Sequence, residues 1–248
     1  MASLLRKLFK IEQASISGNY QMINSNYTEI GFTLRDAWKD PSIPHSQRSI
    51  VNNELKRMYK GLVPVTYQIL ADAVRATGSE ENQIIEVGCA SGYYSEVLHY
   101  LLGHPIKYIG VDYSPALIRL ARHKYPNTLF TLGDATALPF ESKKVDILIS
   151  GCVMLHVPNY PQVISESARV SRKWVIFHRT PVTPGKTIYL TKLAYGVRCL
   201  EIVFGESELL GLFRENGLNV IKTFEIGQNS IPCTNDRGSG ITYLCKFS

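Results

Sequence analysis

The segment from Gln83 to Leu102 joins a short apolar strand, a loop of small residues and a helix, and it constrains the fold more than any other part of the chain. The strand contains a single acid, Glu86, and its apolar neighbours predict burial on both faces, as in a parallel sheet. The loop contains Gly88, Ala90 and Gly92, whose small size permits a tight turn and a close approach of the backbone to a ligand. The helix presents its free N–H groups and the positive end of its dipole to the same crevice. The segment therefore predicts a nucleotide-type pocket at the carboxyl end of the strand.

The same alternation of apolar strand and helix continues along the chain. Further strands are expected at residues 105–111, 128–131, 145–150, 174–178, 218–226 and 240–247, and helices at 93–102, 114–124, 160–170 and 206–216. Most of these strands are apolar throughout, which predicts a parallel sheet covered by helices on both faces. The last two strands follow one another without a helix, and this favours an antiparallel pair. The predicted fold class is α/β, a doubly wound, seven-stranded, mainly parallel Rossmann-like sheet with an antiparallel last strand and an N-terminal helical lid.

Two regions stand outside this alternation. Residues 1–60 are polar and show no strand pattern, and we expect short helices followed by a longer helix from about Ser46, which together form an N-terminal extension or lid. Residues 61–248 are expected to form the main domain. Within it, residues 179–205 begin with prolines and a glycine and continue with tyrosines and aliphatic side chains, which predicts an insertion on the substrate side of the sheet.

Charge and composition limit the classes of partner. The formal net charge is +6, but the basic residues are dispersed and no signature of a nucleic-acid-binding module is present, so no nucleic-acid partner is expected. The apolar runs are too short to span a membrane. Residues 1–10 are amphipathic and basic, which allows a weak peripheral membrane contact or, alternatively, packing on the domain. The widely spaced cysteines have no metal-ligand pattern, which indicates reduced thiols, no metal and a cytoplasmic location.

Acidic and small residues follow the next three strands, at the edge of the sheet where the first loop also lies. Asp112 ends the second strand, where a carboxylate is placed to accept hydrogen bonds from both hydroxyls of a ribose. Asp134 follows the third strand and is placed to accept an amino N–H of an adenine in the next groove. Each acid has a structural alternative, because Asp112 is also placed to cap the next helix and Asp134 to form an Asx turn. The Gly151-Cys152 turn follows the fourth strand.

Together these segments resemble the class I S-adenosylmethionine-dependent methyltransferases, from about Ile84 to Phe247. Glu86-Val-Gly88-Cys-Ala-Ser-Gly92 stands where that family has an acid-x-Gly-x-Gly-x-Gly signature, and Val111-Asp112-Tyr113-Ser114 resembles its ribose-binding segment. Gly133-Asp134-Ala135-x-x-Leu138-Pro139-Phe140 resembles its adenine-side segment, and Leu155-His156-Val157 resembles the start of its helix after the fourth strand. The resemblance implies S-adenosyl-L-methionine as cofactor, with the cofactor-binding residues Glu86, Gly88, Cys89, Ala90, Gly92, Asp112, Tyr113, Asp134, Ala135, Gly151 and Cys152.

The loop departs from the family signature at one residue. Ala90 stands at the middle glycine, where we expect alanine to be tolerated on the condition that its φ is negative. The chain also lacks the Gly-x-Gly-x-x-Gly pattern of dinucleotide-binding loops, which argues against a hydride-transferring enzyme. Ser91 is expected to cap the helix that follows.

Two histidines are the candidate catalytic residues. A methyl group on a sulfonium is already a strong electrophile, so the resemblance implies catalysis by positioning of the acceptor and, for a hydroxyl, by removal of its proton. His156 is expected to begin the helix after the fourth strand and His178 to end the fifth strand, both at the catalytic edge. With an ordinary pKa near 6.5, either imidazole can act as the base or orient the acceptor. A structural role at the helix start is the alternative for His156.

The resemblance implies that the lid and the insertion form the acceptor site. Their aromatic and charged side chains are the candidate substrate-binding residues, namely Trp38, Tyr20, Tyr27, Arg179, Tyr189 and Tyr195. Ordinary lid packing is the alternative for each aromatic residue, and surface solvation is the alternative for Arg179.

The predicted function is methyl transfer to a small-molecule acceptor, at a hydroxyl of a sugar or other natural product. Methylation of RNA or protein is one alternative, although the place of the Asn/Asp-Pro-Pro-aromatic motif of amino-methylating enzymes holds Ser150-Gly-Cys-Val. A non-catalytic S-adenosylmethionine-binding or scaffold protein is the other. The identity of the acceptor and the oligomeric state stay open.

Overall fold

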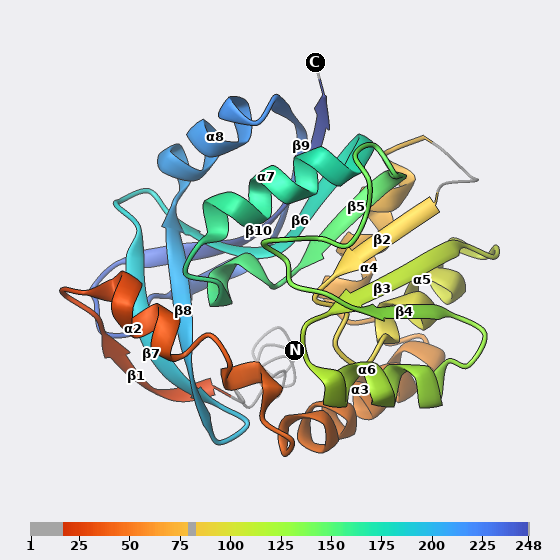
Figure 1. Ribbon diagram of the computed structural model, residues 1–248, viewed down its shortest axis with the longest axis horizontal. Coiled ribbons are helices and arrows are strands. Elements are labelled where there is room, and N and C mark those ends of the chain that lie inside the picture. Colours follow the sequence, from red (N-terminus) through yellow and green to blue (C-terminus); the bar gives the residue numbers. More distant parts are fainter. Residues whose placement is uncertain (1–16, 79–82, 248) are drawn as a thin grey trace, which may run out of the picture.

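A computed structural model describes residues 17–78 and 83–247, and its strands form a sheet through the centre of the molecule (Figure 1). Seven of them have the predicted arrangement, in the order β4-β3-β2-β5-β6-β10-β9. Their bounds are β2 (Gln83–Val87), β3 (Lys107–Asp112), β4 (Leu129–Leu132), β5 (Val145–Gly151), β6 (Ser171–Thr183), β9 (Leu218–Ser230) and β10 (Arg237–Phe247). The strands β2 to β6 pair in parallel, and β10 runs antiparallel to β6 and β9. The predicted α/β fold, with a mainly parallel Rossmann-like sheet and an antiparallel last strand, is confirmed.

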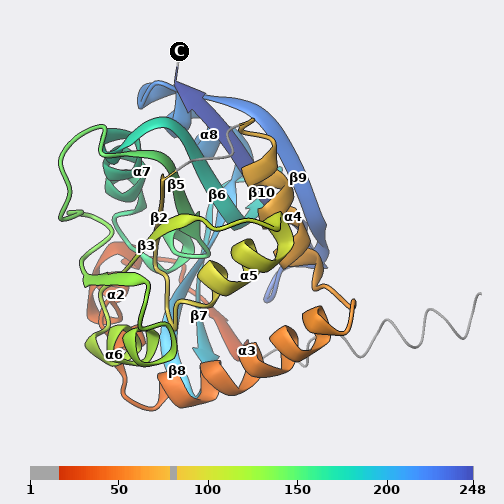
Figure 2. The same ribbon diagram turned by 90° about the vertical axis from the view of Figure 1, so that its right-hand side faces the viewer.

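Helices cover both faces of this sheet (Figures 1 and 2). One face carries α3 (Ile43–Tyr59), α4 (Val65–Arg75), α5 (Tyr93–Leu102) and α6 (Pro115–Lys124), and the other carries α7 (Tyr160–Val170) and α8 (Glu206–Glu215). Successive residues of one strand enter opposite layers: Ile84 packs in the layer of α4 and α5, and Ile85 packs in the layer of α7 and α8. This burial on both faces is the reason that the strands are uninterrupted apolar runs in the sequence.

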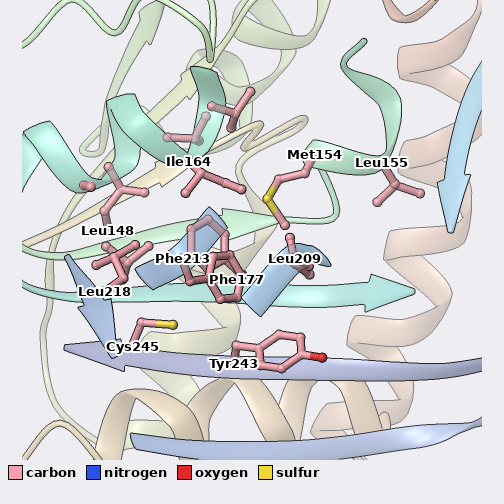
Figure 3. Packing of buried hydrophobic residues seen from close by; sticks show 14 of the residues in the cluster. Leu148, Met154, Leu155, Ile164, Phe177, Leu209, Phe213, Leu218, Tyr243 and Cys245 are labelled. Carbon is pink, nitrogen blue, oxygen red and sulfur yellow. The ribbon is translucent and has the colours of Figure 1, made fainter. Parts of the chain in front are cut away.

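Aromatic rings fill the layer under α7 and α8 (Figure 3). Phe177 of β6 stacks on Phe213 of α8 with 4.5 Å between ring centroids, and Tyr243 of β10 meets Phe213 edge to face. Leu148 of β5 and Ile164 of α7 pack in the same cluster, and all five side chains are fully buried. Close packing of this kind fixes β5 and β6 relative to one another, and therefore also the turns at their carboxyl ends.

Three further strands extend the sheet beyond the predicted seven. An antiparallel hairpin of β7 (Ile188–Ala194) and β8 (Val197–Gly205) lies within the predicted insertion, and β1 (Ser17–Met22) pairs with β7. The hairpin meets the main sheet where Phe204 of β8 pairs with Val182 of β6. The expectation that residues 1–60 contain no strand was therefore wrong. Because β1 is polar and partly exposed, it has no apolar pattern, and its pairing with β7 makes it a strand.

The described part of the N-terminal region continues with α2 (Tyr27–Thr33), the 3₁₀ turn η2 (Ala37–Lys39) and α3. The long helix begins at Ile43, earlier than the expected Ser46, because Pro44 is accommodated in its first turn. A Cβ on Gly31 of α2 would lie 2.8 Å from a ring carbon of Pro158, so this glycine lets α2 pack closely on the main domain. The amphipathic residues 1–10, and with them the expected membrane contact, lie outside the described residues. Within the described ranges, no helix has the length and apolar character needed to cross a membrane.

Candidate functional site

The loop after β2 is fastened to the end of β3. The backbone N–H groups of Gly88 and Cys89 both donate to the carbonyl of Val111, at 2.7 and 2.9 Å. These bonds replace ladder bonds at the point where β2 ends, and they bring the small-residue loop against Asp112. The first two predicted parts of the cofactor site are therefore held together by the backbone itself.

Three residues of this loop have left-handed backbone conformations, with φ of +71° at Gly88, +49° at Ala90 and +76° at Gly92. A Cβ on Gly88 would lie 2.0 Å from a methyl carbon of Val153, and one on Gly92 would lie 2.5 Å from the ring of Phe130. Both glycines are required by close packing as well as by φ. The condition of a negative φ at Ala90 was wrong, because the turn needs a left-handed residue at this position even though an alanine occupies it.

The helix after the loop has a different cap from the expected one. Gly92 is the N-cap of α5, and no side chain caps this end. The Ser91 hydroxyl is buried and has no hydrogen-bond partner within the described residues. Instead, Ser95 in the first turn donates its hydroxyl hydrogen to the carbonyl of Gly92 at 2.7 Å. The left-handed turn places Ser91 one residue before the cap position, so the expectation that it caps the helix was wrong.

Asp112 lies buried at the end of β3, where its carboxylate accepts two backbone hydrogen bonds. Oδ2 accepts from the N–H of Ala90 and Oδ1 from the N–H of Ser114, both at 2.9 Å. The cap of α6 is Ser114, whose side chain accepts from the N–H of Leu117, so Asp112 is not the cap itself. Burial raises the pKa of Asp112 to about 6. A carboxylate offers about four acceptor positions, so two are left for the hydroxyls of a ribose.

Glu86 is buried inside β2, against a partner that the sequence did not indicate. The Tyr108 hydroxyl donates to its carboxyl group, and a Cβ on Gly151 would lie 3.2 Å from Oε1 of Glu86. Burial raises the pKa of Glu86 to about 8, so this side chain is mostly protonated at neutral pH. The side chain therefore connects β2, β3 and the turn after β5, and its contact with a cofactor stays a prediction.

The adenine-side residues lie at the exposed end of β4. Oδ1 of Asp134 accepts from the backbone N–H of Thr136 at 2.8 Å and from its hydroxyl at 2.7 Å, which is the Asx-turn arrangement. The second carboxylate oxygen of Asp134 makes no such turn contact, so the cofactor role stays a prediction. Ala135 is half-buried against the core cluster.

Tyr113, next to the ribose-side acid, joins the main domain to the N-terminal extension. Its hydroxyl donates to the carbonyl of Arg35 at 2.9 Å and accepts from the backbone N–H of Trp38 at 3.1 Å. The resemblance alone placed Tyr113 at the cofactor, and these two bonds give it a second role as the latch that holds η2 over the edge of the sheet.

The turn after β5 brings the two candidate catalytic histidines to the same region. Cys152 has a φ of +60°, and its N–H donates to the carbonyl of His178 at 2.9 Å. His156 lies at the end of the 3₁₀ turn η3 (Met154–His156), not at the start of α7 as expected. Its Nδ1 lies 2.7 Å from the carbonyl oxygen of Leu200 on β8. Burial, followed by the charges of Lys192 and Arg179, lowers the pKa of His156 to about 3.

His178 has a more enclosed position, with 1% of its surface exposed. Its Nδ1 lies 2.8 Å from the hydroxyl of Thr242, and its ring meets the ring of Tyr94 with 5.7 Å between centroids. Burial, and then the charge of Arg179, lowers the pKa of His178 well below its ordinary value. The geometry therefore places His156 under the lid and His178 within the sheet.

The candidate substrate-binding aromatic residues divide into two groups. The indole of Trp38 lies over His156 with 4.7 Å between ring centroids, and Tyr195 meets Trp38 edge to face at 6.0 Å. The other three surround the β1-β7-β8 extension: Tyr27 stacks on Tyr189 at 3.9 Å, and Tyr20 packs in a small apolar cluster with Leu190 and Val203. Trp38 and Tyr195 are thus the two that the fold brings to a candidate catalytic histidine.

Sequence reasoning missed several polar residues of this region. Lys192 of β7 forms an ion pair with Glu201 of β8, both largely buried. Tyr93 and Tyr94 follow the loop directly and lie beside Arg179. The adjacency of the two tyrosines to Gly92 was a signal in the sequence, whereas the ion pair required the hairpin register.

Unpaired polar atoms are concentrated at the same edge. Within the described part of the chain, Nε1 of Trp38, the hydroxyls of Tyr94 and Ser150, and Nε2 of His178 are buried without a hydrogen-bond partner. Buried polar groups are normally paired, and a group of such atoms at one place indicates a site for a polar ligand. A narrow crevice with no room for a water molecule is lined there by Ser150, His178 and Arg179, among others.

Side chains suited to a metal ion are dispersed. In residues 17–78 and 83–247, no three His, Cys, Asp or Glu side chains lie together in a way that could hold a metal. All five cysteines are free thiols. The absence of a metal from the mechanism stays a prediction.

Comparison with known proteins matches the main domain. Residues 79–217, more than half of the chain, match a family model described as a methyltransferase domain. The phthiotriol/phenolphthiotriol dimycocerosates methyltransferase of Mycobacterium leprae is 35% identical over 108 residues, which cover 43% of this chain and 38% of that protein. A probable phthiotriol/phenolphthiotriol dimycocerosates methyltransferase 2 of Mycobacterium ulcerans is 32% identical over 164 residues, 65% of this chain and 63% of that protein. The chain spans less than two thirds of the length of either relative.

A solved structure shares the fold over nearly the whole chain. The 1,6-didemethyltoxoflavin-N1-methyltransferase of Burkholderia thailandensis, solved with 1,6-didemethyltoxoflavin and S-adenosylhomocysteine, superimposes with a TM-score of 0.62 at 15% identity. The match covers 92% of this chain and 95% of that one. The shared fold, the left-handed loop against Asp112 and the matched family model agree: the chain belongs to the methyltransferase-domain family, within the class I S-adenosylmethionine-dependent methyltransferases.

Proposed function

We propose that this protein transfers the methyl group of S-adenosylmethionine to a small-molecule acceptor, at a hydroxyl of a sugar or other natural product. One observation carries the proposal: Nδ1 of His156 lies 2.7 Å from the carbonyl oxygen of Leu200. Because a carbonyl only accepts, Nδ1 must carry the proton, and Nε2 keeps the free electron pair that a base needs. The low pKa of this imidazole keeps it neutral at physiological pH but makes it a weak base, so the proton is expected to reach Nε2 only as the methyl group bonds to the acceptor oxygen.

The residues at the edge of the sheet fit S-adenosylmethionine, the cofactor of this family. Asp112 has acceptor positions left for the ribose hydroxyls, and Oδ2 of Asp134, which the Asx turn does not use, suits the adenine amino group. The loop from Gly88 to Gly92 and the free N–H groups at the start of α5 suit the charged methionine end. When bound there, S-adenosylmethionine supplies the electrophilic methyl group.

The remaining catalytic work would be done by residues of this chain. Nε2 of His156 would accept the proton of the attacking hydroxyl, which makes the oxygen a better nucleophile. The Trp38 ring covers His156, and the Tyr113 latch holds Trp38 in place. We propose the described part of the N-terminal extension, residues 17–60, and the insertion at 179–205, which contains the β7-β8 hairpin, as the lid that positions the acceptor and excludes water.

The compared proteins support a small molecule or lipid as the acceptor. The mycobacterial relatives are named for phthiotriol and phenolphthiotriol dimycocerosates, and the solved structure is named for methylation at N1 of a toxoflavin precursor. A hydroxyl acceptor is favoured here because a positioned neutral imidazole is most useful where a proton must leave an oxygen.

Calorimetry with S-adenosylmethionine and S-adenosylhomocysteine tests the cofactor site. Both should bind the wild type, and Asp112→Ala should weaken binding at least tenfold, because it removes the acceptor of the ribose hydroxyls. Asp146→Ala is the matched control, since Asp146 pairs with Arg172 and Lys173 away from this edge. If neither ligand binds the wild type, the proposal is refuted.

Transfer of a labelled methyl group into fractionated metabolites tests the reaction. Products should form with the wild type and be lost with His156→Gln while S-adenosylhomocysteine binding persists. Tight cofactor binding without transfer to any fraction would favour the non-catalytic alternative.

A further inference from the structure

Strand β6 contains a bulge at the catalytic edge. Against β10, Thr180 pairs with Ile241 and Phe177 pairs with Tyr243, so two residues of β6, His178 and Arg179, oppose one residue of β10. Arg179 has a φ of +58°, a left-handed conformation that non-glycine residues rarely adopt. A bulge of this kind re-aims a side chain, and bulges are common next to active sites. The pairing of β6 with β10 does not by itself explain the bulge at Arg179, so the bulge is a candidate functional feature.

The surroundings of Arg179 contain no counterion in the described residues. Its guanidinium lies among the Cys152 thiol and the hydroxyl groups of Tyr94 and Tyr93, which are its main electrostatic neighbours. None of the ion pairs found in residues 17–78 and 83–247 includes Arg179. The residue is half-buried, its hydrogen-bonding neighbour Tyr94 is neutral, and a half-buried charge without a counterion is costly. An anion that binds at Arg179 would remove this cost.

The nearby charges of this region already have partners: Glu54, which acts on Tyr195 together with Arg179, accepts a hydrogen bond from the Tyr67 hydroxyl. Lys192 is already paired with Glu201, so its charge is balanced within the hairpin. Arg179 lines the same crevice as Met154 and Leu155, the residues just before His156, and its positive charge helps to lower the pKa of His156. An anion held by Arg179 would thus lie in the same region as the atom that His156 deprotonates.

We propose that Arg179 is the anchor for an oxyanion group, a carboxylate or a phosphate, on the methyl acceptor. The inference rests on the proposed function and narrows it: the acceptor is an anionic hydroxy compound, and a neutral sugar does not satisfy the site. Arginine suits this role because its planar guanidinium pairs with both oxygens of a carboxylate or phosphate at once. Tyr94 and His178, two neighbours of Arg179, are 2% and 1% exposed, so little water competes with the pairing.

Binding of small anionic probes tests this assignment. Benzoate, phenyl phosphate and the neutral benzamide are titrated into the wild type by calorimetry, with and without saturating S-adenosylhomocysteine. At least one of the two anions should bind at least tenfold more tightly than benzamide, and the tighter of the two identifies the carboxylate or the phosphate as the preferred group. Equal binding of all three probes, or no binding of either anion, would overturn the proposal.

Variants of Arg179 test its role in anion binding, and a variant of Arg172, on the same strand, is the control. Arg179→Gln should lose the preference for the anion at least tenfold, and Arg179→Lys should bind the anion more weakly than the wild type because it cannot pair with two oxygens. Arg172→Gln is the matched control, since Arg172 is exposed on β6 and pairs with Asp146. An unchanged anion preference in Arg179→Lys and Arg179→Gln would contradict the assignment.

Thermal stability separates this role from a structural one. The melting temperature of Arg179→Gln should equal or exceed that of the wild type without ligand, because the variant removes an unpaired charge. A marked decrease would indicate a structural role instead. Failure of S-adenosylhomocysteine to bind would count against the proposed function. The probe titrations in the absence of S-adenosylhomocysteine test the role of Arg179 separately.

Discussion

The backbone N–H of Ala90 donates to Oδ2 of Asp112 at 2.9 Å, and the left-handed conformation of Ala90 directs the N–H to this acceptor. The methionine-side loop and the ribose-side acid are therefore one hydrogen-bonded unit. A change in the loop conformation is expected to change the position of the carboxylate as well.

Ala90→Gly should raise the free energy of unfolding by about 1 kcal/mol, because glycine adopts a φ of +49° without the steric cost that alanine carries. Urea denaturation measures this difference. Ala116→Gly, at the start of α6, is the control and should lower stability by up to about 1 kcal/mol, since a helical glycine is unfavourable. A loss of stability in Ala90→Gly would mean that the alanine is not strained.

Glu86→Gln should remove part of the pH dependence of stability. Burial raises the pKa of Glu86 from 4.5 to about 8, so between these values the native state binds more protons than the unfolded state. The free energy of unfolding of the wild type should therefore fall as pH rises from about 4.5 to 8. Glutamine does not titrate. The free energy of unfolding of Glu86→Gln, relative to that of the wild type, should therefore rise over this interval, and urea denaturation at a series of pH values measures it. Parallel curves for the two proteins would contradict a raised pKa.

Tyr113→Phe should loosen the lid. The substitution removes the hydroxyl that joins Arg35 and Trp38, and it should lower the free energy of unfolding by about 1–2 kcal/mol. Hydrogen exchange at the backbone amide of Trp38 should become faster. Tyr100→Phe, on the exposed face of α5, is the control and should change neither quantity. Unchanged exchange at Trp38 in Tyr113→Phe would show that the latch does not hold η2.

His156→Gln should lower kcat for methyl transfer by about 10²–10⁴-fold, the usual contribution of a general base, with little change in cofactor affinity. Because the pKa of His156 is lowered to about 3, its imidazole is neutral from pH 5 to 8. With saturating cofactor, kcat of the wild type should not fall through protonation of His156 in that interval. A larger loss of kcat in His178→Gln than in His156→Gln would reassign the base.

The central apolar strands were predictable because they are buried on both faces, and the structure confirms them, although β6 (Ser171–Thr183) extends well beyond the predicted 174–178 and into the predicted insertion. The predicted strand at 145–150 is β5 (Val145–Gly151), and the expected helix stop at Gly217 has the left-handed conformation, with a φ of +71°. The pair of final strands is antiparallel as expected. These features depend on local periodicity and on residues with a strong conformational preference, both of which a sequence contains.

The contacts of the candidate site required tertiary structure. The bond between His156 and Leu200 joins residues 44 positions apart, and the latch at Tyr113 reaches back 75 positions to Trp38. No local sequence pattern predicts either of these two contacts. The same reason explains β1, whose polar residues become a strand only through pairing with β7.

The sequence by itself determined the class of fold and the family, because the strand, the small-residue loop and the acid at Asp112 are close along the chain and leave a local pattern. Only the tertiary structure decided the left-handed φ of Ala90, the partner of Glu86, the contact of His156 Nδ1 with Leu200 and the bulge at Arg179. Each of these depends on which distant strand lies alongside and in which register. Hydrogen bonding and burial between distant segments are set by the packed sheet, and they decide what the site can do chemically.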